Sequence, residues 1–209
     1  MAQGVSERAV TIAMEGGQLA LEGIFLPGEG DECMGAVVAP PHPLYGGSMD
    51  GPVVNELAYA CQKAGHASLR FNWRGVGASA GTTSDKAEHA DEDYSAATLY
   101  LEETVAAPLI AAGYSFGAAA AIRACQRHSR FRCLLLVAPP PALFDSNALA
   151  GLGRRLLLLT GEYDEFAPPE ALEAIASGIP SATLHVIPEA DHFFMKGLAD
   201  ISRVVQGWL

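Results

Sequence analysis

The strongest constraint on the fold is an alternation between short apolar runs and longer stretches with helical spacing of apolar residues. The apolar runs indicate strands buried on both faces, because a strand with one solvated face would alternate polar and apolar side chains. Strands that alternate with helices indicate a parallel sheet covered on both faces, which is an α/β fold. The expected strands are 35–39, 66–71, 108–113, 132–138, 155–160 and 183–187, and the expected helices are 53–64, 87–104, 118–128, 168–177 and one that ends at residue 209.

Two amphipathic runs near the start of the chain are expected to form a β-hairpin. They cover residues 9–14 and 19–25, and only Glu15-Gly16-Gly17-Gln18 separates them. A pair of glycines at such a place is typical of a tight turn between antiparallel strands. The hairpin should therefore add antiparallel strands at one edge of the sheet.

The size and charge of the chain limit what it can be. It has 209 residues, 50% of them hydrophobic, so we expect one folded domain over residues 1–209. The formal net charge is −11 and no run of Lys or Arg offsets it, which argues against nucleic acid and anionic membranes as partners. Part of this charge lies on the expected helix 87–104, with its acidic residues on one face and Tyr94, Ala97 and Leu101 on the other.

The cysteines and the N-terminus favour a cytoplasmic protein. The four cysteines show no C-x-x-C spacing, so we expect buried, reduced thiols rather than disulfides or zinc ligands. The first ten residues include Glu7 and Arg8 and lack the apolar stretch of a signal peptide. No apolar run reaches the ~20 residues of a membrane helix.

The sequence Gly113-Tyr114-Ser115-Phe116-Gly117 matches G-x-S-x-G at the junction of an expected strand and an expected helix. There the serine occupies a strained turn, and the glycines two residues to either side avoid a Cβ clash between strand and helix. The pattern alone also fits a glycine-rich helix entry, but its context favours Ser115 as a nucleophile. The N–H of Phe116 would then lie at the helix N-terminus and stabilise an oxyanion.

A serine nucleophile needs a base, and six histidines compete for that role. Only His42 and His192 lie in loops at the carboxyl ends of expected strands, where the sites of open α/β sheets form. The chain order Ser, Asp or Glu, His selects His192. The histidines interpreted as non-catalytic, because they lie in expected strands or helices, are His66, His89, His128 and His185.

A carboxylate should orient the base, and several are close in the sequence. Asp164 is favoured because it lies a few residues past the expected strand 155–160, after a glycine. Glu162 and Glu165 are interpreted as solvated residues at the rim of the site. Asp191, directly before the histidine, remains an alternative.

The second oxyanion donor should come from the loop after the expected strand 35–39. Pro43 in this loop has no N–H, which makes Leu44 the first choice and Tyr45 the second. The alternative is an ordinary turn around the Gly-Gly pair that follows.

Four segments carry a wider resemblance. They are Pro41-His42-Pro43-Leu44-Tyr45-Gly46-Gly47-Ser48-Met49, Arg70-Phe71-Asn72-Trp73-Arg74-Gly75-Val76-Gly77-Ala78-Ser79, the motif around Ser115, and Asp191-His192-Phe193-Phe194. Together they resemble a bacterial family of small, lidless α/β hydrolases related to the dienelactone hydrolases, and the resemblance covers nearly the whole chain. It implies the α/β-hydrolase fold and the triad Ser115, Asp164 and His192. Dienelactone hydrolases use a cysteine nucleophile, so the serine here argues against that particular activity.

One of these segments also allows other interpretations. Arg74 could anchor a substrate carboxylate, but we favour a role in which Asn72 and Arg74 brace neighbouring loops through hydrogen bonds. Gly75 and Gly77 resemble part of a dinucleotide fingerprint. They follow a strand that is not the first and lead into a loop, so no nucleotide is expected.

The sequence thus predicts a serine hydrolase that cleaves small carboxylic esters without a metal or organic cofactor, as a monomer or homodimer. A peptidase or amidase with the same triad, and a catalytically silent binding module, remain alternatives. The interval between the expected strands 132–138 and 155–160 is too short for a cap domain. We therefore expect an open, shallow pocket lined in part by Tyr45 and Phe144.

Overall fold

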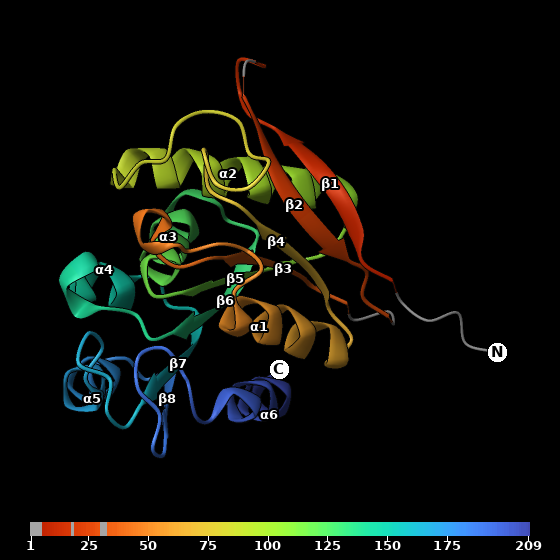
Figure 1. Cartoon of the computed structure of the whole chain (residues 1–209). Coiled ribbons are helices and arrows are strands. Elements are labelled where there is room, and N and C mark those ends of the chain that lie inside the picture. The colour runs from red at the N-terminus through yellow and green to blue at the C-terminus, as the bar shows by residue number, and fades with distance from the viewer. Residues whose placement is uncertain (1–5, 18, 30–32) are drawn as a thin grey trace.

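The computed structural model describes residues 6–17, 19–29 and 33–209, which form an eight-stranded sheet with helices on both faces (Figure 1). The strands are β1 (Arg8–Ala13), β2 (Ala20–Leu26), β3 (Gly35–Ala39), β4 (Ala67–Phe71), β5 (Leu109–Tyr114), β6 (Phe131–Val137), β7 (Arg155–Gly161) and β8 (Ala182–Ile187). The α-helices are α1 (Pro52–Lys63), α2 (Ala87–Thr104), α3 (Phe116–Arg127), α4 (Ser146–Gly151), α5 (Pro169–Ser177) and α6 (Leu198–Trp208). Two short 3-10 helices are η1 (Pro43–Tyr45) and η2 (Pro141–Leu143).

The strands lie in the order β1-β2-β4-β3-β5-β6-β7-β8. Strands β3 to β8 are mutually parallel, whereas β2 is antiparallel to both β1 and β4. The predicted parallel sheet and the hairpin at its edge are therefore confirmed. Gln18 of the predicted turn, and residues 1–5 of the segment considered as a signal peptide, lie outside the described residues.

Two clusters of buried apolar side chains fill the space between the sheet and its helices. One cluster contains residues of α2 and α3, and the other contains residues of α1 and α6. Alternate residues of β3 supply the two clusters, with Val37 and Ala39 in the first and Ala36 and Val38 in the second. Because both faces of β3 are buried, the strand has no polar face, which explains its wholly apolar sequence.

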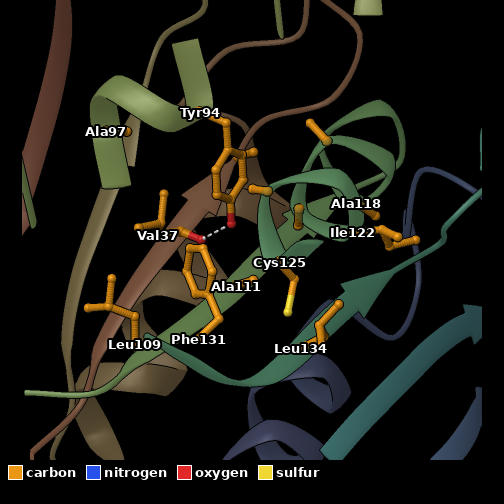
Figure 2. Close-up of a cluster of buried hydrophobic side chains, with 14 of the residues drawn as sticks. Val37, Tyr94, Ala97, Leu109, Ala111, Ala118, Ile122, Cys125, Phe131 and Leu134 are labelled. Carbon is orange, nitrogen blue, oxygen red and sulfur yellow. Dashed lines mark hydrogen bonds between the residues drawn. The ribbon is translucent and has the colours of Figure 1, made fainter. Parts of the chain in front are cut away.

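Tyr94 of α2 places a polar group at the centre of the first cluster (Figure 2). Its hydroxyl lies 2.9 Å from the carbonyl oxygen of Val37 and 3.0 Å from the backbone nitrogen of Ala112. The hydroxyl therefore donates to β3 and accepts from β5, which are neighbouring strands. Burial raises the pKa of Tyr94 well above its usual range, so the phenol stays neutral and keeps the proton that it donates.

The sequence placed the acidic residues of α2 on the face opposite Tyr94, Ala97 and Leu101, but two of them are buried. Asp93 is buried and accepts hydrogen bonds from the backbone and the side chain of Arg74. Asp91 is also buried and pairs with Arg123 at 2.6 Å and Arg127 at 2.7 Å. These carboxylates tolerate burial because arginine partners compensate their charge. Arg74 thus joins its loop to α2, in agreement with the bracing role and not with a substrate anchor.

The segment between β6 and β7 contains only η2, the six-residue helix α4 and short connections. This confirms the prediction that no cap domain is inserted there. Within the part of the chain that the structure describes, no helix has the length and apolar character needed to cross a membrane.

Tyr94→Phe should lower the free energy of unfolding by about 1–3 kcal/mol, because the Ala112 N–H would lose a buried acceptor. Urea denaturation measures this loss. Tyr59→Phe is the matched control, since Tyr59 is 47% exposed on α1 and its removal should change the free energy by less than about 0.5 kcal/mol. Equal effects of the two substitutions would contradict the assignment of a structural hydroxyl.

Candidate active site

Ser115 occupies a strained turn between the end of β5 and the start of α3. Its backbone angles are φ 55° and ψ −116°, a region that a residue with a Cβ rarely adopts. The helix begins at Phe116, two residues before the position predicted from the sequence. The turn is therefore a single residue, and Ser115 lies directly between strand and helix.

The glycines at either side of this turn are required by close backbone contacts. A Cβ at Gly113 would lie 2.3 Å from the carbonyl oxygen of Gly117. A Cβ at Gly117 would lie 2.5 Å from the carbonyl oxygens of Ala39 and Pro40. The first contact joins β5 to α3, and the second joins α3 to the loop after β3. The G-x-S-x-G spacing thus has the physical cause inferred from the sequence.

Ser115, His192 and Asp164 form a continuous line of polar contacts. The Oγ of Ser115 lies 3.0 Å from Nε2 of His192. On the other side of the ring, Nδ1 of His192 lies 2.9 Å from both carboxylate oxygens of Asp164. Asp164 and His192 follow β7 and β8, at the same edge of the sheet as Ser115. All three residues therefore lie where the sequence predicted, and the structure brings them together.

Asp164 is held in place by its own loop. Its Oδ1 accepts hydrogen bonds from the backbone nitrogens of Phe166, at 2.9 Å, and Ala167, at 2.7 Å. The hydroxyl of Thr160, the last residue but one of β7, lies 3.3 Å from its Oδ2. The two backbone donors fix the direction of the carboxylate toward His192.

The competing carboxylates have other partners. Glu162 accepts a hydrogen bond from the backbone nitrogen of Glu189 at 2.8 Å, so it links the loop after β7 to the loop that carries His192. The interpretation of Glu162 as a solvated rim residue therefore misses a structural role. Asp191 accepts from the backbone nitrogens of Phe193 and Met195 within its own turn.

Two other serine–histidine contacts show what distinguishes the candidate site. Ser95 lies 2.9 Å from His128, and Ser84 lies 2.8 Å from His89. Among the described residues, neither of these histidines is hydrogen-bonded to a carboxylate, whereas His192 contacts Asp164. Only the contact at Ser115 thus combines a strained serine with an oriented histidine within the described part of the chain.

Tyr114 is a site residue that the sequence analysis missed. Its side chain lies in the cluster between the sheet and α6, and its hydroxyl donates to the backbone carbonyl of His192 at 2.8 Å. Successive residues of a strand point to opposite faces. The strand alternation therefore fixes the face of the sheet on which the Tyr114 side chain lies. It does not indicate the hydrogen bond from Tyr114 to the backbone of His192.

The two expected oxyanion donors differ in their surroundings. Phe116 supplies the first N–H of α3, and such groups have no partner within their helix. The N–H of Leu44 lies 3.2 Å from Nδ1 of His42. Tyr45, the second choice, donates its N–H to the carbonyl of His42. This engagement of Tyr45 within the turn leaves Leu44 as the better candidate.

The hydrogen bond from the Leu44 N–H to His42 can be exchanged for one to an oxyanion. Burial lowers the pKa of His42, so its imidazole is neutral near pH 7 and Nδ1 can accept a proton donor. Its ring lies 4.7 Å from the rings of both Tyr45 and Phe116. A negatively charged oxygen is a stronger acceptor than neutral imidazole, so an oxyanion can take this donor over.

Exposed aromatic side chains surround the candidate site without covering it. The rings of Phe166 and Phe193 lie 4.8 and 5.6 Å from that of His192, and both side chains are well exposed. Tyr45 is 87% exposed beside His42. Phe144 is partly buried and packs against the first core cluster. Phe166 and Phe193 therefore present apolar surface to solvent beside His192.

A separate hollow of about 1120 Å³ lies between β1 and α2, away from this constellation. Its lining includes Glu15, Glu88, Glu92 and Glu103, and Ser115, Asp164 and His192 do not contribute to it. The hollow is therefore not part of the candidate active site.

The chain is similar in sequence to a known family and to a protein from another organism. Residues 46–145 match the family described as "Serine aminopeptidase, S33". An uncharacterized protein of Rickettsia prowazekii is 27% identical, and the match covers 95% of this chain and 87% of the relative.

Solved structures are similar over nearly the whole chain. An alpha-beta serine hydrolase homologue from Coxiella burnetii is 29% identical with a TM-score of 0.86, and the match covers 97% of each chain. A serine hydrolase without a lid from Xanthomonas campestris is 27% identical with a TM-score of 0.82, over 98% of this chain and 95% of that one. Est1E from Butyrivibrio proteoclasticus, solved with ferulic acid, shares the fold at 17% identity and a TM-score of 0.82, over 96% and 97% of the two chains.

The thiols should not take part in the chemistry of this site. Burial raises the pKa of Cys61 to about 12 and that of Cys133 to about 11, and it raises the pKa of Cys125 as well. Since only a thiolate reacts readily, these three cysteines should resist iodoacetamide at pH 8, and Cys33, which is partly exposed, should react alone. Mass spectrometry of the alkylated native protein measures this, with unfolded protein as the fully labelled control. Modification of a buried thiol that parallels a loss of hydrolysis would contradict the expectation.

Proposed function

Because this chain has the α/β-hydrolase fold and is similar to small serine hydrolases of that fold, we propose that it hydrolyses small carboxylic esters with Ser115 as nucleophile. The observation that carries the proposal is the unbroken line of contacts from Ser115 through His192 to Asp164. The serine sits on a strained turn at a helix N-terminus, and the aspartate is buried and aimed at the base. A structural hydrogen bond alone would require none of this strain.

The reaction follows from these positions. Nε2 of His192 accepts the proton of the Ser115 hydroxyl as Oγ forms a bond to the ester carbonyl carbon. The carbonyl oxygen gains the negative charge, which the N–H groups of Phe116 and Leu44 stabilise. When the intermediate collapses, the bond to the leaving alcohol breaks and His192 returns the proton to that oxygen. Asp164 keeps the ring oriented and stabilises its charged form.

The second half of the reaction repeats the same roles with water. His192 accepts a proton from a water molecule that attacks the acyl carbon, and the resulting tetrahedral intermediate expels the oxygen of Ser115. The acid leaves, and the serine recovers its proton from His192. These steps use groups of this chain and water.

Two other functions use the same fold. Residues 46–145 match a family named for a serine aminopeptidase, which supports a peptidase or amidase as the second candidate. Hydrolysis of an aryl ester compared with the matched aryl amide separates the two activities. A silent binding module would not label with a fluorophosphonate, whereas an active serine would.

The open surface around His192 favours short acyl chains. With no cap between β6 and β7, few apolar side chains remain to bury a long chain. Leu44, Tyr45, Phe116 and Phe144 are the residues that we propose as the shallow acyl pocket. The free cysteines are consistent with a cytoplasmic location, which we include in the proposal.

Ser115→Ala and His192→Ala should each reduce kcat/KM for a short ester by about 10⁴-fold, and the double variant should lose little more. The reason is that nucleophile and base act as one unit. Steady-state kinetics on folded variants measure both losses. Additive losses would show that the two residues do not work together.

Asp164→Asn should reduce kcat by about 10³-fold or more, because the amide cannot stabilise the charged ring of His192. The matched control is Asp191→Asn, since Asp191 is a neighbouring carboxylate whose hydrogen bonds stay within its own turn. This variant should retain activity within a few-fold. A larger loss in the control would transfer the orienting role to Asp191.

The ratio kcat/KM should stop rising after a few acyl carbons, because a methylene left in water forgoes about 0.8 kcal/mol of binding free energy. A series of p-nitrophenyl esters from acetate to palmitate measures the profile. A maximum at ten or more carbons, or activation at a lipid interface, would contradict an open site.

A further inference from the structure

The segment 70–79 has no part in the chemistry proposed above, yet it lies against the loop that carries Leu44. This loop runs from Pro40 to Met49 and contains η1. Two adjacent residues of the segment, Asn72 and Trp73, are hydrogen-bonded to the two ends of that loop. Both side chains are buried, with exposed fractions of 2%.

Trp73 holds the start of the loop. Its indole Nε1 lies 3.2 Å from the carbonyl oxygen of Pro40 and 3.0 Å from that of Pro41, so one N–H is shared between two consecutive carbonyls. The indole also packs edge-on against Phe116, with ring centres 5.7 Å apart. A single side chain thus contacts the segments that supply both candidate oxyanion donors.

Asn72 holds the end of the loop. Its Oδ1 accepts a hydrogen bond from the backbone nitrogen of Met49 at 2.8 Å. Its Nδ2 donates to Oε2 of Glu22 at 2.9 Å, and the same oxygen accepts from the backbone nitrogen of Ala78. With both ends of the amide engaged, the side chain of Asn72 has a fixed orientation.

Between these two attachments the loop is tightly folded. The backbone nitrogens of Tyr45 and Gly47 both donate to the carbonyl of His42. A Cβ at Gly47 would lie 2.3 Å from the carbonyl oxygen of Pro41. Because the loop has little internal freedom, fixing its two ends also fixes the direction of the Leu44 N–H.

We propose that Asn72 and Trp73 are positioning residues that set the oxyanion donor Leu44, and that neither touches the substrate. This inference rests on the proposed function. It also assigns a role to the segment 70–79. Asn72 and Trp73 hold the loop Pro40–Met49, and Arg74 joins the segment itself to Asp93 of α2. Removal of a complete oxyanion donor costs about 10²–10³-fold in kcat, so a displaced donor should cost about tenfold.

The test uses Trp73→Phe, which removes the shared N–H and keeps an aromatic ring in the core. We expect kcat for a short p-nitrophenyl ester to fall about tenfold while KM changes less than about twofold. The pH midpoint of kcat/KM should stay where it is, because the contacts of His192 are untouched. The affinity for a phenylboronic acid should fall by about the same factor as kcat, since its tetrahedral adduct places an oxygen where the oxyanion forms.

Trp208→Phe is the matched control, because Trp208 lies on α6, where its ring stacks against Arg155. It should leave kcat and boronate affinity unchanged. Asn72→Ala is the second variant and should repeat the kinetic pattern of Trp73→Phe. Fluorophosphonate titration supplies the number of competent sites, so every rate is expressed per active serine.

The outcomes separate the two proposals. A wild-type protein that neither labels with fluorophosphonate nor cleaves esters would overturn the proposed function and, with it, the positioning role. An active wild type with an unchanged kcat per site in Trp73→Phe would overturn the positioning role alone. A lower melting temperature without a change in kcat or boronate affinity would do the same, because it would assign Trp73 to stability only.

Discussion

The strained backbone at Ser115 is the constraint on which the rest of the site depends. A non-glycine residue at φ 55° costs on the order of 1–3 kcal/mol, and it persists only where its surroundings leave no alternative. Here β5 lies between β3 and β6, and the backbone of α3 packs directly on β5 at Gly113 and on the β3 loop at Gly117. The buried sheet supplies the stability that keeps Ser115, which is partly buried, in this strained conformation.

The same sheet determines which other residues can reach that hydroxyl. Strands β3, β5, β6, β7 and β8 are parallel, so their carboxyl ends share one edge, and the loops after β3, β7 and β8 carry Leu44, Asp164 and His192. Hydrogen bonds that involve these loops fix their positions relative to one another and to the sheet. Glu162 joins the loop of Asp164 to the loop of His192, and Tyr114 ties the backbone of His192 to β5.

The strands, the hairpin and the proximity of Ser115, Asp164 and His192 were predictable because each left a local signal in the sequence. Apolar runs mark buried strands, and the chain order of Ser115, Asp164 and His192 follows from the topology of the sheet. The hydrogen bonds of Tyr114, Glu162 and Trp73 could not be predicted, because no motif or chain order links them to partners 78, 27 and 32–33 positions away. The burial of Asp93 was also missed, because its arginine partner lies on a different element.

The short connection between β6 and β7 has a further consequence for how such a chain can acquire new selectivity. Leu149 is the buried residue of α4, so the segment contributes little to the core. A surface segment with few buried groups tolerates insertion, and the paired residues of β6 and β7 lie outside this connection. A longer helical hairpin inserted there would extend over the edge of the sheet where Ser115 lies, and it would leave β5 and α3 unchanged. Under the proposed function, the shape of the pocket could therefore change at this loop while Ser115, His192 and Asp164 stay in place.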